Sequence, residues 1–383
     1  MPLKKYLKNL NNNLPNISLY IHFPWCEKKC PYCDFNVTTV KKDGDIFALT
    51  EAVINDISLS KDDINNRKFQ SVYFGGGTPS LVPEEYFKKI LDFLRKKEMI
   101  DSSAEITVEF NPKEANKDKI ASLLSAGINR ISLGVQSFDE SVLNQLGRNH
   151  SAVEAKKAIA NLAYFSNLNT TIDLIYGVMD QSSKSFENDI NLFLDHDINH
   201  LSLYQLTIEP NTIFYKKELN LPDELKINQF ENIAKQLLKD SGYLQYEVSS
   251  WCKENKKSAH NINYWSYGDF LGVGPGAHSK ITNSDGIQRQ MRLKKLTSYI
   301  NNPQKKKSET IAYEDINFDF MINFLRMKNK TSFESFEERF DYLDKSKFFK
   351  SYEKGIELGL LEKSHVGTTE KGFRLLNDTV NLF

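Results

Sequence analysis

The sequence has few cysteines and no long apolar run. Only four cysteines occur in 383 residues, and three of them fall between positions 26 and 33, which is the reverse of the spread that a disulfide framework needs. The longest apolar stretch, at residues 318–325, is interrupted by Asp319 and Asn323 and is far shorter than the roughly 20 residues that cross a bilayer. The sequence therefore predicts a protein that neither depends on disulfides nor spans a membrane.

The sequence also lacks net charge. Lys plus Arg and Asp plus Glu both number 50, and the longest run of like charge is three lysines at 305–307. This balance argues against nucleic acid or an anionic membrane as a partner. The lysines of the first eight residues are followed by the asparagine-rich residues 9–16, where an export signal would need an apolar core. We expect a soluble, cytoplasmic protein.

Short β-branched runs alternate with amphipathic segments from residue 17 to residue 206. This alternation is typical of parallel strands joined by helical crossovers and predicts an α/β fold with a complete or partial (β/α) barrel. Strands are expected at residues 17–23, 71–74, 105–110, 130–135, 170–175 and 200–206, and helices at 46–59, 83–97, 117–126, 152–164 and 185–194.

The pattern changes twice after the barrel. Turn-rich sequence follows residue 245, and helical patterns return at 316–327, 332–340 and 344–358, before residues 359–363 and 372–376, which predict a small β-wing. We divide the chain into an N-terminal segment (1–16), a partial barrel (17–245), a connecting region (246–304) and a smaller C-terminal domain (305–383) that is mainly helical and winged-helix-like.

Three cysteines form the strongest candidate site. Cys26, Cys30 and Cys33 directly follow the first predicted strand, so their thiolates can converge from one loop. Three thiolates suit either a zinc site that lacks a ligand or a four-iron four-sulfur cluster with one open iron. The nearest histidine, His22, lies inside the strand, which favours the cluster. An amino acid can chelate an open iron through its amine and carboxylate. Cys252 receives no role.

Polar residues and glycines stand where the predicted strands end. These are residues 75–78, Glu109, Gln136 and Asp173, and the carboxyl ends of barrel strands are where chemistry gathers. Glu109 can accept hydrogen bonds from an ammonium or a ribose and Asp173 from ribose hydroxyls, while Arg148 can clamp a carboxylate. The glycine triplet predicts either a tight turn or a close approach of the backbone to a ligand.

The cysteine spacing, followed by Gly75-Gly76-Gly77-Thr78-Pro79, resembles the radical S-adenosylmethionine superfamily. The motifs at 20–26, 109–112, 134–138, 147–148 and 173–177 resemble its oxygen-independent coproporphyrinogen oxidase-like family. The resemblance implies a four-iron four-sulfur cluster on the three cysteines and bound S-adenosylmethionine. It implies one S-adenosylmethionine site with Tyr20, Gly76 and Glu109, and a second with Tyr32, Gly77, Thr78, Gln136, Arg148 and Asp173.

Two features depart from the oxidases. Phe35 stands where they carry a fourth loop cysteine, and the segment before Cys26 is short. Both departures argue against coproporphyrinogen decarboxylation, the oxidase step of porphyrin biosynthesis, and against a complete second S-adenosylmethionine site. A radical S-adenosylmethionine enzyme that acts on a porphyrinogen stays the alternative.

Within the family, the sequence resembles the HemW-type heme chaperones through His260-Asn-Ile-Asn-Tyr264-Trp265. The resemblance implies heme as a cofactor and an unidentified heme-acceptor protein as a partner. An imidazole can ligate heme iron, and aromatic rings offer flat surface to a porphyrin. We therefore expect His260 to be the heme ligand, in a loop at the barrel mouth, with Tyr264 and Trp265 beside it. His278 is the second candidate.

Overall fold

The computed structural model describes residues 14–39, 44–328, 331–340 and 343–383, so the predicted N-terminal segment lies mostly outside the described residues. Its strands form one twelve-stranded sheet in the order β12-β11-β10-β9-β1-β2-β3-β4-β5-β6-β8-β7. The strands are β1 Ile17–Phe23, β2 Phe69–Gly76, β3 Ile100–Phe110, β4 Arg130–Gln136, β5 Asn169–Tyr176, β6 His200–Gln205, β7 Leu244–Glu247, β8 Ser250–Cys252, β9 Asp269–Val273, β10 His278–Asn283, β11 Gly286–Arg292 and β12 Lys306–Thr310.

The sheet curves into an open barrel. Strands β1 to β6 pair in parallel and in chain order, and β9 adds in parallel to the other side of β1. Antiparallel strands extend both ends of this parallel part, and the ends, β12 and β7, are not paired to each other within the described sheet. The predicted partial barrel is confirmed.

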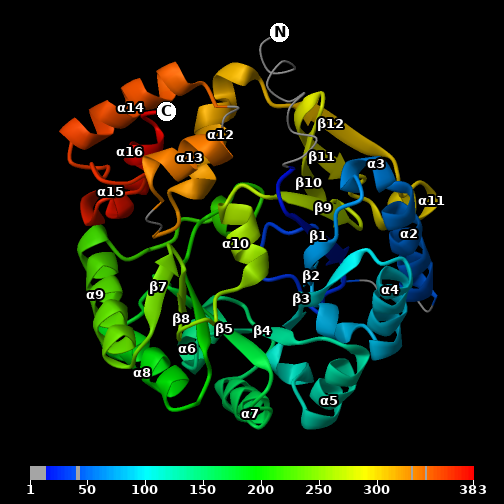
Figure 1. The fold of residues 1–383 in the computed structure, drawn as a ribbon. Coiled ribbons are helices and arrows are strands. Elements are labelled where there is room, and N and C mark those ends of the chain that lie inside the picture. The colour runs from blue at the N-terminus through cyan, green and yellow to red at the C-terminus, as the bar shows by residue number, and fades with distance from the viewer. Residues whose placement is uncertain (1–13, 40–43, 329–330, 341–342) are drawn as a thin grey trace.

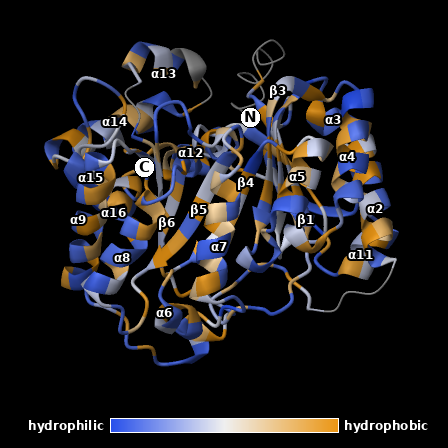
Figure 2. Cartoon of the chain, turned by 90° about the horizontal axis from the view of Figure 1, so that it is seen from below, coloured by the Kyte–Doolittle hydropathy of each residue, from blue (hydrophilic) through white to orange (hydrophobic). Residues whose placement is uncertain are grey.

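Helices cover the outside of the sheet (Figure 1). Outer helices such as α4 and α8 carry both hydrophilic and hydrophobic residues (Figure 2), and α4 buries Phe87, Ile90 and Leu94. The helices are α2 Asp45–Leu59, α3 Lys61–Ile64, α4 Glu84–Lys96, α5 Lys117–Ala126, α6 Glu140–Gln145, α7 Ala152–Ala163, α8 Ser183–Leu194, α9 Glu224–Asp240, α10 Ala259–Trp265, α11 Leu296–Asn301, α12 Ile316–Phe324, α13 Phe333–Arg339, α14 Lys345–Glu357, α15 Glu370–Arg374 and α16 Leu376–Val380.

Local sequence signals explain why the barrel elements could be predicted. Every predicted strand and helix up to residue 206 is present, with ends shifted by at most five residues. Helix α5, for example, begins after Asn116, whose side chain accepts a hydrogen bond from Lys119 N, and ends at Gly127, whose φ is 103°. Asparagine favours the position before the first turn of a helix, and glycine favours the position after its last turn.

Buried apolar side chains form three clusters among the described residues. The largest belongs to the barrel and its outer helices. A second joins α12, α13, α14 and α16 to Tyr267 and Ile287, and Figure 1 shows the C-terminal helices gathered on the side of the molecule where α9 lies. A third and smaller cluster lies around Ile175 and Leu206, at the ends of β5 and β6. The predicted domain boundaries stay a prediction. Among the described residues, no helix combines the length and apolarity that a membrane crossing requires.

The predicted β-wing is wrong in its second strand. Residues 372–376 fall in α15 and at the start of α16, and residues 359–363 contribute only an isolated bridge between Leu361 and Thr368. Thr369 caps α15 by accepting a hydrogen bond from Gly372 N. A Cβ at Gly372 would lie 1.9 Å from Leu360 O, so this glycine allows close packing rather than a turn. The winged-helix character of this unit stays a prediction.

Candidate functional site

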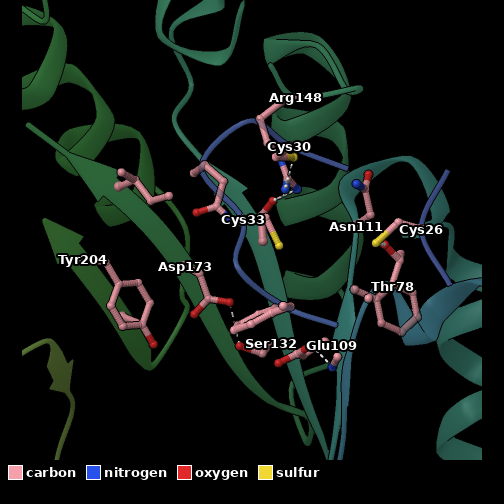
Figure 3. A pocket seen from close by; sticks show the side chains of 18 of the residues that line it. Cys26, Cys30, Cys33, Thr78, Glu109, Asn111, Ser132, Arg148, Asp173 and Tyr204 are labelled. Carbon is pink, nitrogen blue, oxygen red and sulfur yellow. Dashed lines mark hydrogen bonds between the residues drawn. The ribbon is translucent and has the colours of Figure 1, made fainter. Parts of the chain in front are cut away.

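A cavity of about 420 Å³ lies within the curve of the sheet. Its walls come from strands β2 to β6, from the loop after β1 that carries the three cysteines, and from the start of α10. Figure 3 shows Cys26, Cys30 and Cys33 at one side of this space, with Glu109 and Asp173 projecting into it; Glu109 comes from β3 and Asp173 from β5. The fold thus brings the cysteines and the strand-end residues into one site.

Backbone hydrogen bonds fix the cysteine loop against the end of β1. Cys26 N donates to Thr38 O at 3.0 Å, Thr38 N donates to Pro24 O at 2.7 Å, and Cys33 N donates to Cys30 O at 3.1 Å. All three thiols are free, partly exposed and part of the cavity wall. This loop presents three sulfur ligands from a short segment to one enclosed volume.

Burial controls the ionisation of two of these thiols. It raises the pKa of Cys26, and it raises the pKa of Cys33 to about 11. A bound metal stabilises the thiolate form, so metal binding at this loop would release protons. In the described part of the chain, no three His, Cys, Asp or Glu side chains lie close enough to share a single metal ion.

Polar groups surround the cysteine sulfurs. Thr78 Oγ1 lies 3.6 Å from Cys26 Sγ, and Arg148 Nη1 lies 3.6 Å from Cys30 Sγ and 3.4 Å from the hydroxyl of Tyr32. A guanidinium beside thiolates offsets their negative charge in a partly buried setting. Thr78, Arg148 and Tyr32, predicted for a second S-adenosylmethionine site, all line the cavity; that role stays a prediction.

The glycine triplet allows the end of β2 to approach the backbone of residues 23–25 closely. Gly77 N donates to Phe23 O at 2.8 Å, and a Cβ at Gly77 would lie 2.4 Å from Trp25 O. Gly76 has a φ of 117°, which favours glycine. A larger residue at Gly77 would therefore push the cysteine loop away from β2. Gly76 and Gly77 also line the cavity.

Glu109 is held by two donors from β2. The hydroxyl of Tyr73 donates to Oε1 at 2.9 Å, and Gly76 N donates to Oε2 at 3.1 Å. Burial raises the pKa of Glu109 to about 7. The carboxyl group is thus poised between its charged and neutral forms near neutral pH, and its remaining acceptor positions face the cavity side of the strand.

Asp173 and Gln136 lie on the next two strands. Ser132 donates to Asp173 Oδ2 at 2.8 Å, and burial raises the pKa of Asp173 to about 6. Gln136 has a φ of 68° beside a register shift in the pairing of β4 with β5. A non-glycine residue in this conformation costs of order 1–3 kcal/mol and is often found at functional sites.

Tyr20 differs from the other predicted cofactor residues, which all line the cavity. It lies on β1 as the register partner of Tyr73 on β2, stacks on the ring of Tyr73 and shares a hydrogen bond of 3.1 Å with His22, so it packs beside the lining residue Tyr73 on the same face of the sheet. Sequence reasoning also missed lining residues deeper in the barrel. They occupy alternate positions along strands, and this period of two was the available signal. They are Thr107, Arg130, Ser132, Thr171, His200, Ser202 and Tyr204.

The predicted placement of His260 in a loop at the barrel mouth is wrong. Residues 259–265 form helix α10, which Ser258 caps by accepting a hydrogen bond from Asn261 N. The helix is too short for a periodic pattern to be read from sequence. It packs against β2 from inside the barrel, as its central position in Figure 1 shows. His260 is only 3% exposed.

The other predicted heme residues also lie away from the cavity wall. Tyr264 stacks on Phe270 with ring centroids 4.2 Å apart, and Trp265 holds the guanidinium of Arg326 at 4.3 Å from its ring. His278 is exposed at the start of β10, and partial desolvation of its ring, with the nearby charges of Lys294 and Arg289, lowers its pKa. The structure brings none of these four residues together with the cysteines.

Comparisons with known proteins identify the relatives of this chain. Residues 20–193 match the family model of the radical SAM superfamily. The chain is 37% identical over 377 residues to the heme chaperone HemW of Buchnera aphidicola subsp. Schizaphis graminum, covering 97% of this chain and 99% of that protein. It is 38% identical over 316 residues to the heme chaperone HemW of Escherichia coli K12, covering 82% and 83%.

A solved structure shares the fold. The coproporphyrinogen III oxidase HemN from Escherichia coli superposes with a TM-score of 0.80 over 98% of this chain and 92% of that chain, at 22% identity. This similarity concerns the fold alone. It agrees with the open barrel seen here. The chain belongs to the HemW family of the radical SAM superfamily.

Proposed function

We propose that the chain is a heme chaperone of the cytoplasm, which binds heme and transfers it to an acceptor protein. We further propose that Cys26, Cys30 and Cys33 hold a four-iron four-sulfur cluster whose open iron takes S-adenosylmethionine. The observation that carries the proposal is the match with heme chaperones along almost the whole chain, together with a single cavity that contains the cysteines and the strand-end polar residues.

The residues present suit these groups. Three free thiols from one loop provide the ligand set of a cluster with an open iron. When bound, such a cluster supplies one-electron reduction of the sulfonium beside it. Arg148 would balance the charge of the thiolates at Cys30, while Glu109 and Asp173 would accept hydrogen bonds from the ammonium and ribose of S-adenosylmethionine.

For heme, we propose ligation by His260, with Tyr264 and Trp265 as contacts of the porphyrin. In the described conformation His260 is buried against β2, so ligation requires α10 to move. We expect a heme titration followed by Soret absorption to give one site per chain. His260→Ala should shift the Soret band and weaken heme binding at least tenfold, because loss of a metal bond costs more than loss of ring contact.

Matched variants make this titration decisive. Tyr264→Ala and Trp265→Ala should weaken binding less, because they remove ring surface only. His196→Ala is the control, since His196 is half-buried at the end of α8 and outside the cavity. His200 would be a poor control, because it is buried and hydrogen-bonded to the hydroxyl of Tyr246 at 2.8 Å. An unchanged spectrum and affinity in His260→Ala would remove the ligand assignment, and absence of any specific heme binding would remove the chaperone proposal.

A second candidate is a radical S-adenosylmethionine enzyme that acts on a porphyrinogen. The observation in its favour is the pair of cavity carboxyl groups, Glu109 and Asp173, whose pKa values burial raises to about 7 and about 6. Groups that titrate near neutral pH can transfer protons in catalysis. An assay for coproporphyrinogen decarboxylation separates the two candidates.

A further inference from the structure

Helix α10 is anchored inside the barrel by the side chain of Glu105 on β3. Glu105 Oε1 accepts hydrogen bonds from His260 N at 3.1 Å and Ser258 Oγ at 3.3 Å, and Oε2 accepts one from Ala259 N at 3.1 Å. Arg130 Nη1 lies 3.3 Å from the same Oε2, and Arg130 is 2% exposed. One carboxylate therefore joins a barrel strand to three groups at the start of α10.

In this position of α10, the ring of His260 is covered by side chains of β2. Its Nδ1 lies 2.8 Å from Ser71 Oγ, and its ring stacks on Tyr73 with centroids 4.8 Å apart. Its Nε2 is buried and has no hydrogen-bond partner among the described residues. A buried, unpaired ring nitrogen costs free energy, so its ligand-free position must be held by contacts elsewhere on the helix.

The two ends of α10 are held by different forces. The C-terminal end is held by ring contacts, Tyr264 on Phe270 and Trp265 against Arg326, and by Asn263 Nδ2, which donates to Asp269 O at 2.7 Å. At the N-terminal end, the hydrogen bonds to the carboxylate of Glu105 add to the contacts of His260 with Ser71 and Tyr73. Hydrogen bonds to an ionised group are about twice as strong as neutral ones. Neutralising Glu105 should therefore loosen the His260 end of α10 while its other end stays packed.

We propose that Glu105 is a positioning residue for His260. It anchors the start of α10 inside the barrel, and this anchor keeps Nε2 of His260 covered until the helix moves. The inference rests on the proposed function, in which His260 ligates the heme iron; Nε2 would be the ligating atom, because Nδ1 already has Ser71 Oγ as its partner. Glu105 then regulates how readily heme reaches that atom.

The first test needs no heme. Diethyl pyrocarbonate acylates neutral imidazole nitrogens, and burial lowers the pKa of His260 to about 3, so at pH 7 its rate of modification reports accessibility rather than protonation. We would follow acylation of His260 in the full-length protein by peptide mass spectrometry, with exposed His278 as the internal reference.

Glu105→Gln removes the charge and one acceptor from the anchor. We expect acylation of His260 to become on the order of tenfold faster, since loss of charge-assisted hydrogen bonds changes an opening equilibrium by about that factor, while His278 reacts at the wild-type rate. Glu154→Gln is the matched control, because Glu154 accepts a hydrogen bond from Ser151 N at the start of α7. An equal rate at His260 in wild type and folded Glu105→Gln would overturn the proposal.

Ser258→Ala weakens the same anchor from the side of the helix and covers the case in which Glu105→Gln does not fold. It should give a smaller acceleration at His260, because it removes one of the hydrogen bonds to Glu105. Both variants are compared with wild type by circular dichroism and thermal unfolding. If Glu105→Gln does not fold and folded Ser258→Ala shows the wild-type acylation rate at His260, the proposal is also overturned.

A second readout separates this inference from the proposed function. Stopped-flow heme association should be faster in Glu105→Gln than in wild type by a factor similar to the acylation effect, and unchanged in Glu154→Gln. Faster acylation with unchanged heme association would overturn the role of Glu105 in heme access. If no variant binds heme, the proposed function fails, whereas faster acylation in Glu105→Gln still supports Glu105 as the residue that positions and covers His260.

Discussion

At the scale of single residues, three of the four cysteines differ from the fourth in their position relative to the cavity. Cys26, Cys30 and Cys33 line the cavity, whereas Cys252 is buried in β8 outside it. We expect anaerobic reconstitution to give about four irons per chain. Replacing any of the three cysteines with Ala should abolish the broad visible absorption of the iron–sulfur cluster, and Cys252→Ala should leave the iron content and the spectrum unchanged. Stoichiometric zinc without iron in protein purified anaerobically would contradict the cluster assignment.

Glu109 makes the stability of the ligand-free protein depend on pH. Burial raises its pKa from 4.5 to about 7. Below pH 4.5 the carboxyl group is protonated in both the folded and unfolded states. Between pH 4.5 and 7 the unfolded chain releases the proton and the folded chain retains it, so the free energy of unfolding falls as pH rises. The loss is complete above pH 7.

Glu109→Gln removes this titration. The wild-type free energy of unfolding should fall between pH 5 and pH 8 for this reason, whereas that of the variant should not. The difference, variant minus wild type, should therefore increase by about 1–3 kcal/mol over this range, as measured by urea unfolding of the ligand-free protein. Glu85→Gln, which changes an exposed glutamate on α4, is the control for removal of a surface carboxylate. A difference from wild type that stays constant between the two pH values would show that Glu109 does not titrate in this range.

At the scale of elements, a buried ion pair fastens the antiparallel extension of the sheet to the outer helices. Arg292 on β11 donates to both carboxylate oxygens of Asp56 on α2, at 2.8 and 2.9 Å, and Tyr299 on α11 donates to Asp56 at 2.9 Å. Arg292 is 1% exposed and Asp56 is 0% exposed. Removing one partner would leave a buried charge uncompensated.

Asp56→Ala should therefore destabilise the protein by about 3–5 kcal/mol, the usual cost of breaking a buried pair. Asp92→Ala is the control, because Asp92 pairs with Lys88 on the exposed face of α4 and such pairs contribute about 0.3–0.5 kcal/mol. Chemical unfolding curves would provide both values. A similar small cost for the two variants would mean that β11 is held to α2 by apolar contacts instead.

Elements also differ in how far sequence could predict them. Strand β1 is largely buried and mostly apolar, β4 carries Ile131, Leu133 and Val135 at alternate buried positions, and helices such as α5 and α7 carry capping residues. These are local signals of strands and helices. Helix α10 spans only seven residues, so its sequence shows no period. Its position depends on Glu105, which is 153 residues away from Ser258 along the chain.

At the scale of the whole molecule, the fold is shared with a coproporphyrinogen oxidase. The predicted difference from the oxidases is Phe35, which the sequence resemblance places at the position of their fourth loop cysteine and which is 56% exposed. We expect no conversion of coproporphyrinogen to protoporphyrinogen by the reconstituted protein with reductant and excess S-adenosylmethionine, followed by porphyrin fluorescence after oxidation. The Escherichia coli oxidase is the positive control. Multiple turnovers by this chain would favour the enzyme as its function.

The sequence by itself determined the open barrel, the cysteine loop and the strand-end residues, because strand burial, cysteine spacing and glycine positions are local signals. Only the tertiary structure decided that Tyr20 packs beside Tyr73 without lining the cavity and that His260 lies covered inside the barrel. It also decided that Glu105 anchors α10 and that residues 372–376 are helical. These features depend on contacts between residues far apart in the chain, which short-range patterns do not encode.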